Sequence, residues 1–255
     1  MSKKEQSKGR GAGLILLILL VAVCIAAVIV RPSLPQETPT RPAQTTAAAQ
    51  TTPIRTEPIQ TVPIAAETQP PINLGYGLQI TDSGSYTGLY MEDGSNEIVS
   101  DVMMVVVENT GEEDIQLAEF TAVSGGEEYR FKLTNLAAGE RAVLLEQERR
   151  ASSGAALDSA VAGNVALFPE SMELYEDTIE IGGLEGMLNV QNISGSDISG
   201  DICIYYKYAA QDIYYGGITF RVRIEGGLKA GELRQIPAGH FDPDGCAVVQ
   251  VTIYE

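Results

Sequence analysis

The sequence has no tryptophan, one histidine and only three cysteines among its 255 residues. A Ser-His-Asp or Cys-His arrangement would have to use His240, because the chain holds no other imidazole. A structural zinc site needs several Cys or His ligands, and only His240, Cys203 and Cys246 lie beyond the first third of the chain. There is no Gly-x-Ser-x-Gly elbow and no phosphate-binding loop. We therefore expect no catalytic residues, no cofactor, no metal and no enzymatic activity.

Positive charge is also scarce. From residue 72 onward the chain has ten Lys and Arg against thirty Asp and Glu. Such a surface repels phosphate backbones, so nucleic acid is not an expected partner. Asp242-Pro243-Asp244-Gly245 is similar to the start of a calcium loop, but the closing glutamate is missing. Asp-Gly before a strand is ordinary turn chemistry, and we expect a turn there.

Only one long hydrophobic run exists, over residues 13–30. Its eighteen residues carry no charge and include thirteen Leu, Ile or Val. As a helix it would span roughly 27 Å, close to the hydrocarbon thickness of a bilayer. Four cations precede it and only one follows closely, so the positive-inside rule places residues 1–12 in the cytoplasm and the rest outside. The sequence predicts a single-pass protein of the cell membrane with its C-terminal domains extracellular.

Two processing routes compete with this uncut anchor. A cleaved signal peptide has a shorter apolar core followed by a small-x-small site, whereas this run ends in Val30-Arg31-Pro32. A lipoprotein would be cut before Cys24, yet Val23 stands where a small residue is wanted. Both routes stay open, and the uncut anchor is favoured.

Residues 31–71 differ from everything around them. They hold nine of the twelve prolines, many threonines and no aromatic residue. A five-residue repeat begins at Pro53, Pro58 and Pro63. Proline prevents helices and central strands, and such a segment cannot bury enough apolar surface to offset its ordering entropy. We expect a disordered, extended Pro/Thr-rich stalk.

From residue 72 the composition becomes that of an all-β fold. Short runs of Val, Ile, Tyr and Thr alternate with turns rich in Gly, Asp, Asn and Ser. Ile218–Ile224 alternates strictly between apolar and polar residues, which indicates an antiparallel strand with one solvated face. The one helix-like stretch is Ala155–Val161.

This outer region repeats itself. Val107–Gly111 with Asp114 matches Val190–Ser194 with Asp197 at an offset of 83 residues, and Leu136–Glu140 matches Leu228–Glu232 at an offset of 92. The nine additional residues are assigned to the Tyr-rich hairpin around Ala209–Gly217. The repeat predicts two tandem antiparallel β-sandwiches, over residues 72–169 and 170–255.

The repeated pattern, a strand ending in Val-x-Asn and later a Leu-x-Ala-Gly-Glu turn, resembles the bacterial cell-adhesion-related (CARDB) and FxLYD-type domains. The resemblance implies immunoglobulin-like sandwiches on a bacterial surface. The second half departs from the FxLYD pattern, because it reads Cys203-Ile204-Tyr205-Tyr206 where Leu-Tyr-Asp would stand.

The two outer cysteines are predicted to be free thiols. In the last strand Ala247, Val249 and Val251 are expected to share the core face, which leaves Cys246 on the other face. Cys203 is likewise out of step with its isoleucine neighbours. A buried bridge between the sheets is therefore not expected.

Five tyrosines cluster within eleven residues, at positions 205, 206, 208, 214 and 215. They suit a strand, and they also suit a contact surface. We place a possible partner contact at Tyr214 and Tyr215, on the longest predicted hairpin. The expected function is a non-catalytic, membrane-anchored interaction, adhesion or scaffold protein of the bacterial cell envelope with a protein partner. The alternative is an extracytoplasmic glycan-binding or sensing module that contacts cell-wall glycan.

Overall fold

A computed structural model describes residues 70–254, apart from residue 96, and they belong to one compact unit. The predicted cytoplasmic tail, the membrane segment over residues 13–30 and the stalk up to residue 69 lie outside the described residues. No helix in the described part of the chain is long and apolar enough to cross a membrane. The described region is all-β, as the sequence predicts.

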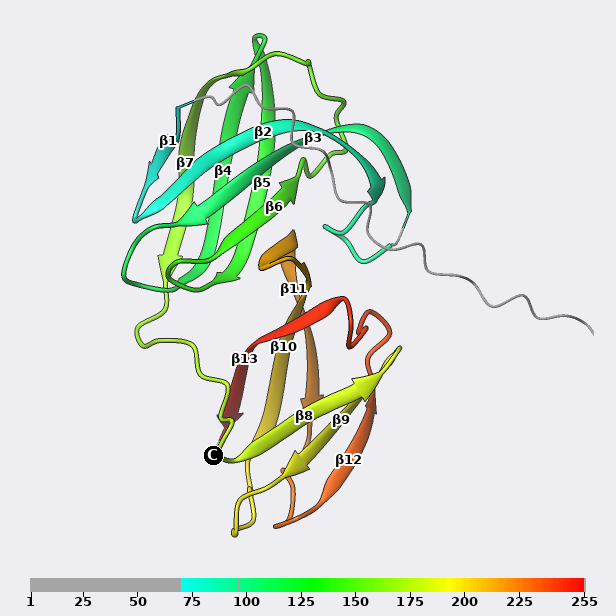
Figure 1. Ribbon diagram of the computed structural model, residues 1–255. Helices are drawn as coiled ribbons and strands as arrows, with labels where there is room; N and C mark the ends of the chain where they lie inside the picture. Colours follow the sequence, from blue (N-terminus) through cyan, green and yellow to red (C-terminus); the bar gives the residue numbers. More distant parts are fainter. Residues whose placement is uncertain (1–69, 96, 255) are drawn as a thin grey trace, which may run out of the picture. The chain divides into compact units, whose positions relative to one another are not determined.

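Thirteen strands make up this region (Figure 1). They are β1 Ile72–Gly75, β2 Leu78–Leu89, β3 Ile98–Asn109, β4 Ile115–Ser124, β5 Glu127–Leu136, β6 Arg141–Leu145, β7 Leu157–Leu167, β8 Ile179–Leu184, β9 Met187–Asn192, β10 Asp201–Ala210, β11 Ile213–Ile224, β12 Leu233–Pro237 and β13 Cys246–Tyr254. The helix expected over Ala155–Val161 is wrong, because β7 runs through it. Antiparallel pairing with β4 overrides the weak helix preference of so short a stretch.

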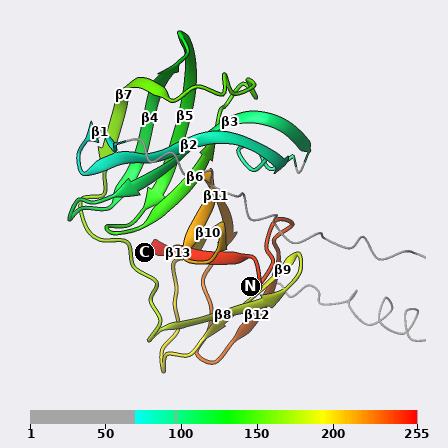
Figure 2. The same cartoon turned by 45° about the horizontal axis from the view of Figure 1, so that its top comes forward.

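The same strand order occurs twice along the chain. In the first half, β1 to β7, the sheet β2-β3-β6 faces the sheet β5-β4-β7. In the second half, β8 to β13, the sheet β8-β9-β12 faces β11-β10-β13. Figure 2 shows β4, β5 and β7 side by side in one layer. All pairing inside each half is antiparallel, and a parallel contact between β6 and β11 joins the halves into a seven-stranded sheet.

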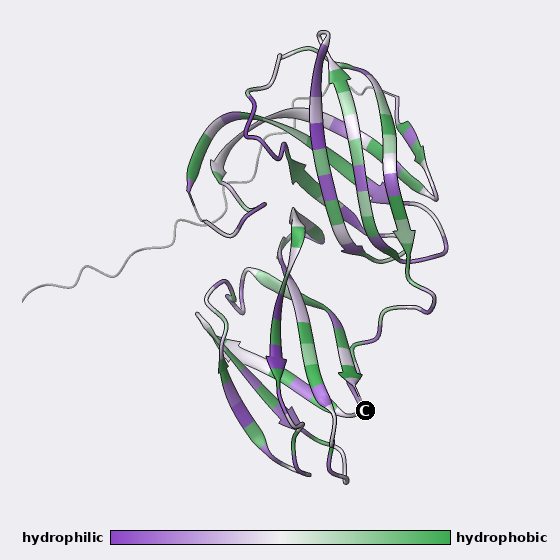
Figure 3. Cartoon of the chain, turned by 180° about the vertical axis from the view of Figure 1, so that it is seen from behind, coloured by the Kyte–Doolittle hydropathy of each residue, from purple (hydrophilic) through white to green (hydrophobic). Residues whose placement is uncertain are grey.

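Each half has a core between its two layers. The first is built around Phe120 and Phe131, whose rings stack 5.3 Å apart, and the second around Tyr206 and Phe241. Hydrophobic and hydrophilic residues alternate along the strands (Figure 3). In β5, for example, Tyr129, Phe131 and Leu133 are buried while the intervening side chains point outward. Period-two burial is what the sequence pattern predicts for antiparallel sandwiches.

The repeated Val-x-Asn sequence is a buried clasp in both halves. Asn109 is fully buried, and its Nδ2 donates to the carbonyls of Glu113 at 2.9 Å and Leu136 at 3.2 Å. Asn192 is equally buried, and its Nδ2 donates to Ser196 O at 2.8 Å and Leu228 O at 3.1 Å. Each Oδ1 accepts the backbone N–H two residues on. The clasp ties the end of one strand to the turn that closes the sandwich.

The Leu-x-Ala-Gly-Glu turn completes the clasp in both halves. Glu140 Oε2 accepts the N–H of Ala137 at 3.0 Å, and Glu232 Oε2 accepts that of Lys229 at 2.9 Å. Asp114 and Asp197 each accept a further N–H of the same turn. The glycine of each turn has a positive φ, 80° and 75°, which explains why glycine stands there. The sequence repeat is thus a repeat of hydrogen bonds.

The nine additional residues extend one hairpin of the second half. By the repeat, Ser124 corresponds to Lys207 and Glu127 to Thr219, so residues 208–218 replace the two-residue turn Gly125-Gly126. They lengthen β10 and β11, and their turn residues Gln211 and Asp212 have positive φ of 54° and 61°. We call residues 208–218 the tip. The hairpin predicted over Ala209–Gly217 is present, and most of its residues are paired strand.

The cysteine prediction is confirmed in its outcome and wrong in part of its reasoning. Cys203 and Cys246 are both free thiols. Cys203 lies opposite the core face, as expected, yet it is only 3% exposed. In β13 the pairing with β10 skips Val249, and this bulge reverses the parity of everything before it. Cys246 therefore packs against the second core.

Candidate functional site

The structure buries Tyr215 and partly buries Tyr214. Tyr215 is 6% exposed, and Tyr214 packs against the first core. The Tyr214 hydroxyl donates to Glu140 Oε1 at 2.6 Å, and burial followed by this carboxylate raises the pKa of Tyr214. Their backbones pair in parallel with Ala142 and Val143 of β6. The expectation that these rings stand free for a partner is not met, because they contact the first half of their own chain.

The tip forms a third core with the outer face of the first half. Tyr215 of the tip packs there with Met104, Val106 and Val143, on the face of β3 and β6 that points away from the first core. The equivalent of Val143 in the second half is Gln235, so only the first half offers this apolar face. We call the tip and the surface it covers the joint. The members of the third core are Tyr86, Tyr90, Met91, Val102, Met104, Val106, Val143, Leu145 and Tyr215, flanked by Leu89, Val99, Tyr208, Ala210 and Ile213.

Two glycines let the tip approach this closely. A Cβ on Gly217 would lie 1.7 Å from the carbonyl oxygen of Lys132, which is far inside contact distance. A Cβ on Gly216, whose φ is 89°, would lie 3.1 Å from Met91 Cβ. Gly217 O also accepts a hydrogen bond from Thr134 Oγ1 at 3.1 Å. Only glycine allows the two backbones to meet at this distance.

A carboxylate and an amine bind the backbone of the same residue of the joint, Gly217. Glu92 Oε2 accepts the N–H of Gly217 at 2.8 Å, and Glu92 Oε1 accepts that of Leu145 at 2.8 Å. Lys207 is fully buried, and its Nζ donates to the carbonyls of Gly217 at 3.1 Å and Ile218 at 3.0 Å. Glu92 comes from the first half and Lys207 from the second. We call these two residues the clamp.

Burial perturbs both groups of the clamp. It raises the pKa of Glu92 to about 7, against the hydrogen bonds from Leu145 and Gly217 and the attraction of Lys207. Burial likewise lowers the pKa of Lys207 to about 7, against the attraction of Glu92 and Glu140. Strongly perturbed, buried ionisable pairs often mark functional sites, though they also occur in structural networks. Here both groups are bonded to backbone, which points to a structural or regulatory role.

Sequence reasoning missed the clamp. Strand parity places Lys207 with Cys203 and Tyr205 on the face that looks away from the second core, where a lysine is usually exposed to solvent. Glu92 lies just after β2, where an acid is unremarkable. One signal was present: Lys207 directly precedes the nine-residue insertion. A charge beside an apolar insertion is a candidate for burial by the insertion itself.

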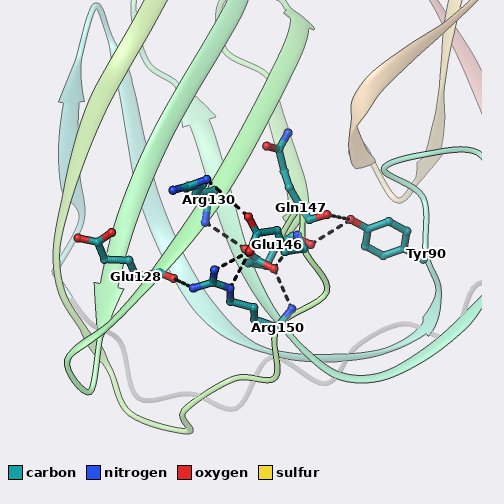
Figure 4. Close-up of polar contacts among 7 residues, drawn as sticks. Tyr90, Glu128, Arg130, Glu146, Gln147 and Arg150 are labelled. Carbon is teal, nitrogen blue, oxygen red and sulfur yellow. Dashed lines mark hydrogen bonds and ion pairs between the residues drawn. The ribbon is translucent and has the colours of Figure 1, made fainter.

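A fully buried acid, Glu146, organises a loop. Its side chain accepts the backbone N–H groups of Glu148 and Arg150, each at 2.8 Å (Figure 4). Its own carbonyl accepts the Tyr90 hydroxyl at 3.0 Å. These bonds hold the segment after β6 in place, so Glu146 stabilises the loop. Its carboxylate is engaged by backbone N–H groups and is not positioned to exchange a proton with a substrate.

The remaining chemical candidates have local roles. His240 stacks on Phe220 with ring centroids 4.5 Å apart. Asp242 accepts the N–H of Asp244 at 3.0 Å, as in an ordinary Asx turn. Within residues 70–254 no group of three His, Cys, Asp or Glu side chains is arranged to hold a metal ion. A shallow hollow on the outer face of β4, β5 and β7 is lined by polar residues, among them Thr121, Arg130 and Asn164.

One solvent-facing patch combines residue types that proteins use for contacts. Tyr205 in β10 lies opposite Arg221 in β11, and Asp201 lies opposite Tyr254 in β13. Directly opposed residues share a face, so these side chains lie on the outer surface of the second half. Tyr254 is 54% exposed, and burial followed by Tyr254 raises the pKa of Tyr205. We call Tyr205, Arg221, Arg223 and Tyr254 the tyrosine–arginine face.

Arg221 and Arg223 differ in how they are held. Arg223 is bound by Asp201, which accepts from both its Nε and its Nη2. Arg221 is exposed beside the Tyr205 hydroxyl. Tyrosine and arginine are enriched at protein interfaces, whereas most of this chain's surface is acidic.

No family model, curated protein or solved structure matches this chain. The resemblance to CARDB and FxLYD-type domains therefore stays a prediction. What can be said of function rests on the geometry of the joint and of the tyrosine–arginine face.

Proposed function

We propose that this chain is a membrane-anchored, non-catalytic interaction or scaffold protein of the bacterial cell envelope, whose outer part is two immunoglobulin-like domains locked together. The joint is the observation that supports it. Contacts between domains of one chain are usually small and polar, and relative motion is the default. Here a nine-residue insertion contributes to a separate apolar core and a buried clamp. Such a joint suits a module that presents a surface at a set orientation.

The tyrosine–arginine face is the surface we propose for the partner. It replaces Tyr214 and Tyr215, whose rings are occupied within the chain. Exposed Tyr254 and Arg221 offer an apolar ring, hydroxyl groups and a cation at little conformational cost. A protein partner with acidic side chains fits this chemistry.

Photo-crosslinking in cells tests the contact. We expect a photoreactive residue at position 254 to yield a discrete protein adduct, and Arg221→Ala to lower its yield about tenfold, as expected for loss of an interface arginine. The matched control is position 161, because Val161 is also exposed but lies on β7 of the first half. Equal adducts from both positions would contradict a specific face. Retention on cell-wall glycan without any protein adduct would favour the glycan-binding alternative.

Protease treatment of intact cells tests the location. An uncut anchor over residues 13–30 predicts that added protease releases a fragment that begins within residues 31–71 and extends through the β region, while a short basic stub stays in the membrane. The two fragments can be identified by mass spectrometry. A mature N-terminus near Arg31 in untreated cells would show a cleaved signal peptide instead.

A further inference from the structure

The clamp binds both backbone polar groups of one residue, Gly217. Glu92 takes the N–H of Gly217 and Lys207 takes its carbonyl, so both side chains bind the base of the tip. When the tip is docked, Lys207 is fully buried and Glu92 is partly buried, and their hydrogen bonds go to backbone groups. When the tip lifts off, both groups are hydrated. Docking therefore carries the desolvation cost of two charges whose mutual attraction does not cancel it.

We propose that the joint is a proton-controlled clamp. The tip is held most weakly in the pH range in which Glu92 and Lys207 are both charged when the tip is undocked and hydrated. The tip is held more tightly when either charge is removed. The neutral side chains can still make the same hydrogen bonds. A neutral amine keeps two N–H groups for its two carbonyls, and a neutral carboxyl group keeps lone pairs that accept N–H groups. This inference concerns the joint alone, and it stands whether or not the tyrosine–arginine face binds a partner.

The direction of the pH dependence follows from the two shifts. The pKa of Glu92 is raised from 4.5 to about 7, so the docked state binds an extra proton between these values and tightens as the pH falls. The pKa of Lys207 is lowered from 10.5 to about 7, so the docked state releases a proton between these values and tightens as the pH rises. Docking is therefore weakest near pH 7 and gains on both sides of it.

Several other ionisable groups surround the clamp. Glu140, from the turn before β6, attracts Lys207 and is bonded to the Tyr214 hydroxyl. Lys132 of β5 contributes its carbonyl to the joint, while its side chain pairs with Glu119. The remaining ionisable neighbours are Asp93 paired with Arg149, the exposed Asp212 of the turn, the tyrosines 90, 208 and 215, and His240, which lies against Gly94.

Hydrogen exchange of the full chain in detergent tests the clamp. Protection of peptides that cover residues 208–218, corrected for the intrinsic exchange rate, should be lowest near pH 7. It should rise about tenfold at pH 5.5 and about tenfold at pH 8.5, as expected for one proton on each side. The hairpin of β4 and β5 is the internal control, because it lacks the insertion and should show no minimum near pH 7.

Variants separate the two branches. Glu92→Gln should abolish the rise toward pH 5.5, and Lys207→Met the rise toward pH 8.5. If either single variant fails to fold, Glu92→Gln with Lys207→Met removes both charges together and should leave a flat profile. Glu119→Gln, in an exposed ion pair on β4, should leave the wild-type profile unchanged. A flat or steadily rising wild-type profile, or a minimum that survives in the double variant, would overturn the proposal.

Discussion

Replacing Gly217 by alanine is expected to break the joint and to lower the free energy of unfolding by about 3–5 kcal/mol, as large core lesions do. The new Cβ would lie 1.7 Å from the Lys132 carbonyl oxygen. Because that atom belongs to the backbone of a paired strand, the tip has to move instead. The tip would then lose its hydrogen bond to Glu92 and withdraw Tyr215 from the third core. Urea unfolding followed by circular dichroism measures the loss.

The form of the transition is as informative as its midpoint. With the joint intact, the two halves are expected to unfold together, whereas Gly217→Ala should broaden or split the transition because each half then unfolds by itself. Gly182→Ala is the matched control, since its Cβ would meet nothing within 4 Å and it also lies in a strand. That control should change stability by no more than about 0.5 kcal/mol. A Gly217→Ala protein as stable as the control would refute the described close approach.

The second large effect is expected at the asparagine clasps. Asn109→Ala and Asn192→Ala should each cost about 2–4 kcal/mol, because each leaves buried backbone carbonyls without a donor. The two losses should be similar in size, since the bonds are equivalent: Asn109 serves Glu113 and Leu136, and Asn192 serves Ser196 and Leu228. Denaturant midpoints of the two purified variants provide the comparison.

Asn164→Ala is the control for the clasps. Asn164 is an exposed asparagine in β7, and its replacement should be close to neutral. If one clasp variant were as stable as this control while the other were not, the two asparagines would be equivalent in sequence but would not contribute equally to stability. Aspartate at either position should also be destabilising, because it removes the Nδ2 donor and buries a charge.

The repeat shows how far the sequence alone reaches. Matching Asn109 with Asn192 by pattern identified two residues that prove to make the same hydrogen bonds. The count of nine extra residues, and their place in the Tyr-rich hairpin, also agree with the structure. These features are local, since turn residues, caps and alternation depend on neighbours a few positions away. A structural feature can be predicted from the sequence when the residues that cause it lie close together in the chain.

The errors share a different cause. The strand β7 replaced the expected helix because pairing with β4 outweighs local preference. Cys246 moved to the core side because one bulge at Val249 reverses the strand's parity, and no residue type announces a bulge. Tyr214 and Tyr215 were expected to be exposed because they lie near a hairpin turn. Tyr215 is buried and Tyr214 is partly buried, because another part of the chain covers them.

The sequence by itself determined the all-β class of residues 72–254, the positions of the repeated clasps and the site of the insertion, because each depends on side-chain alternation and turn chemistry within a short window. Only the tertiary structure decided that the insertion docks on β6, that Gly217 must lack a side chain, and that Glu92 and Lys207 both bind the backbone of Gly217. Glu92 and Lys207 lie far apart along the chain. Their burial, and hence their shifted pKa values, arises only when the two halves pack together and exclude water.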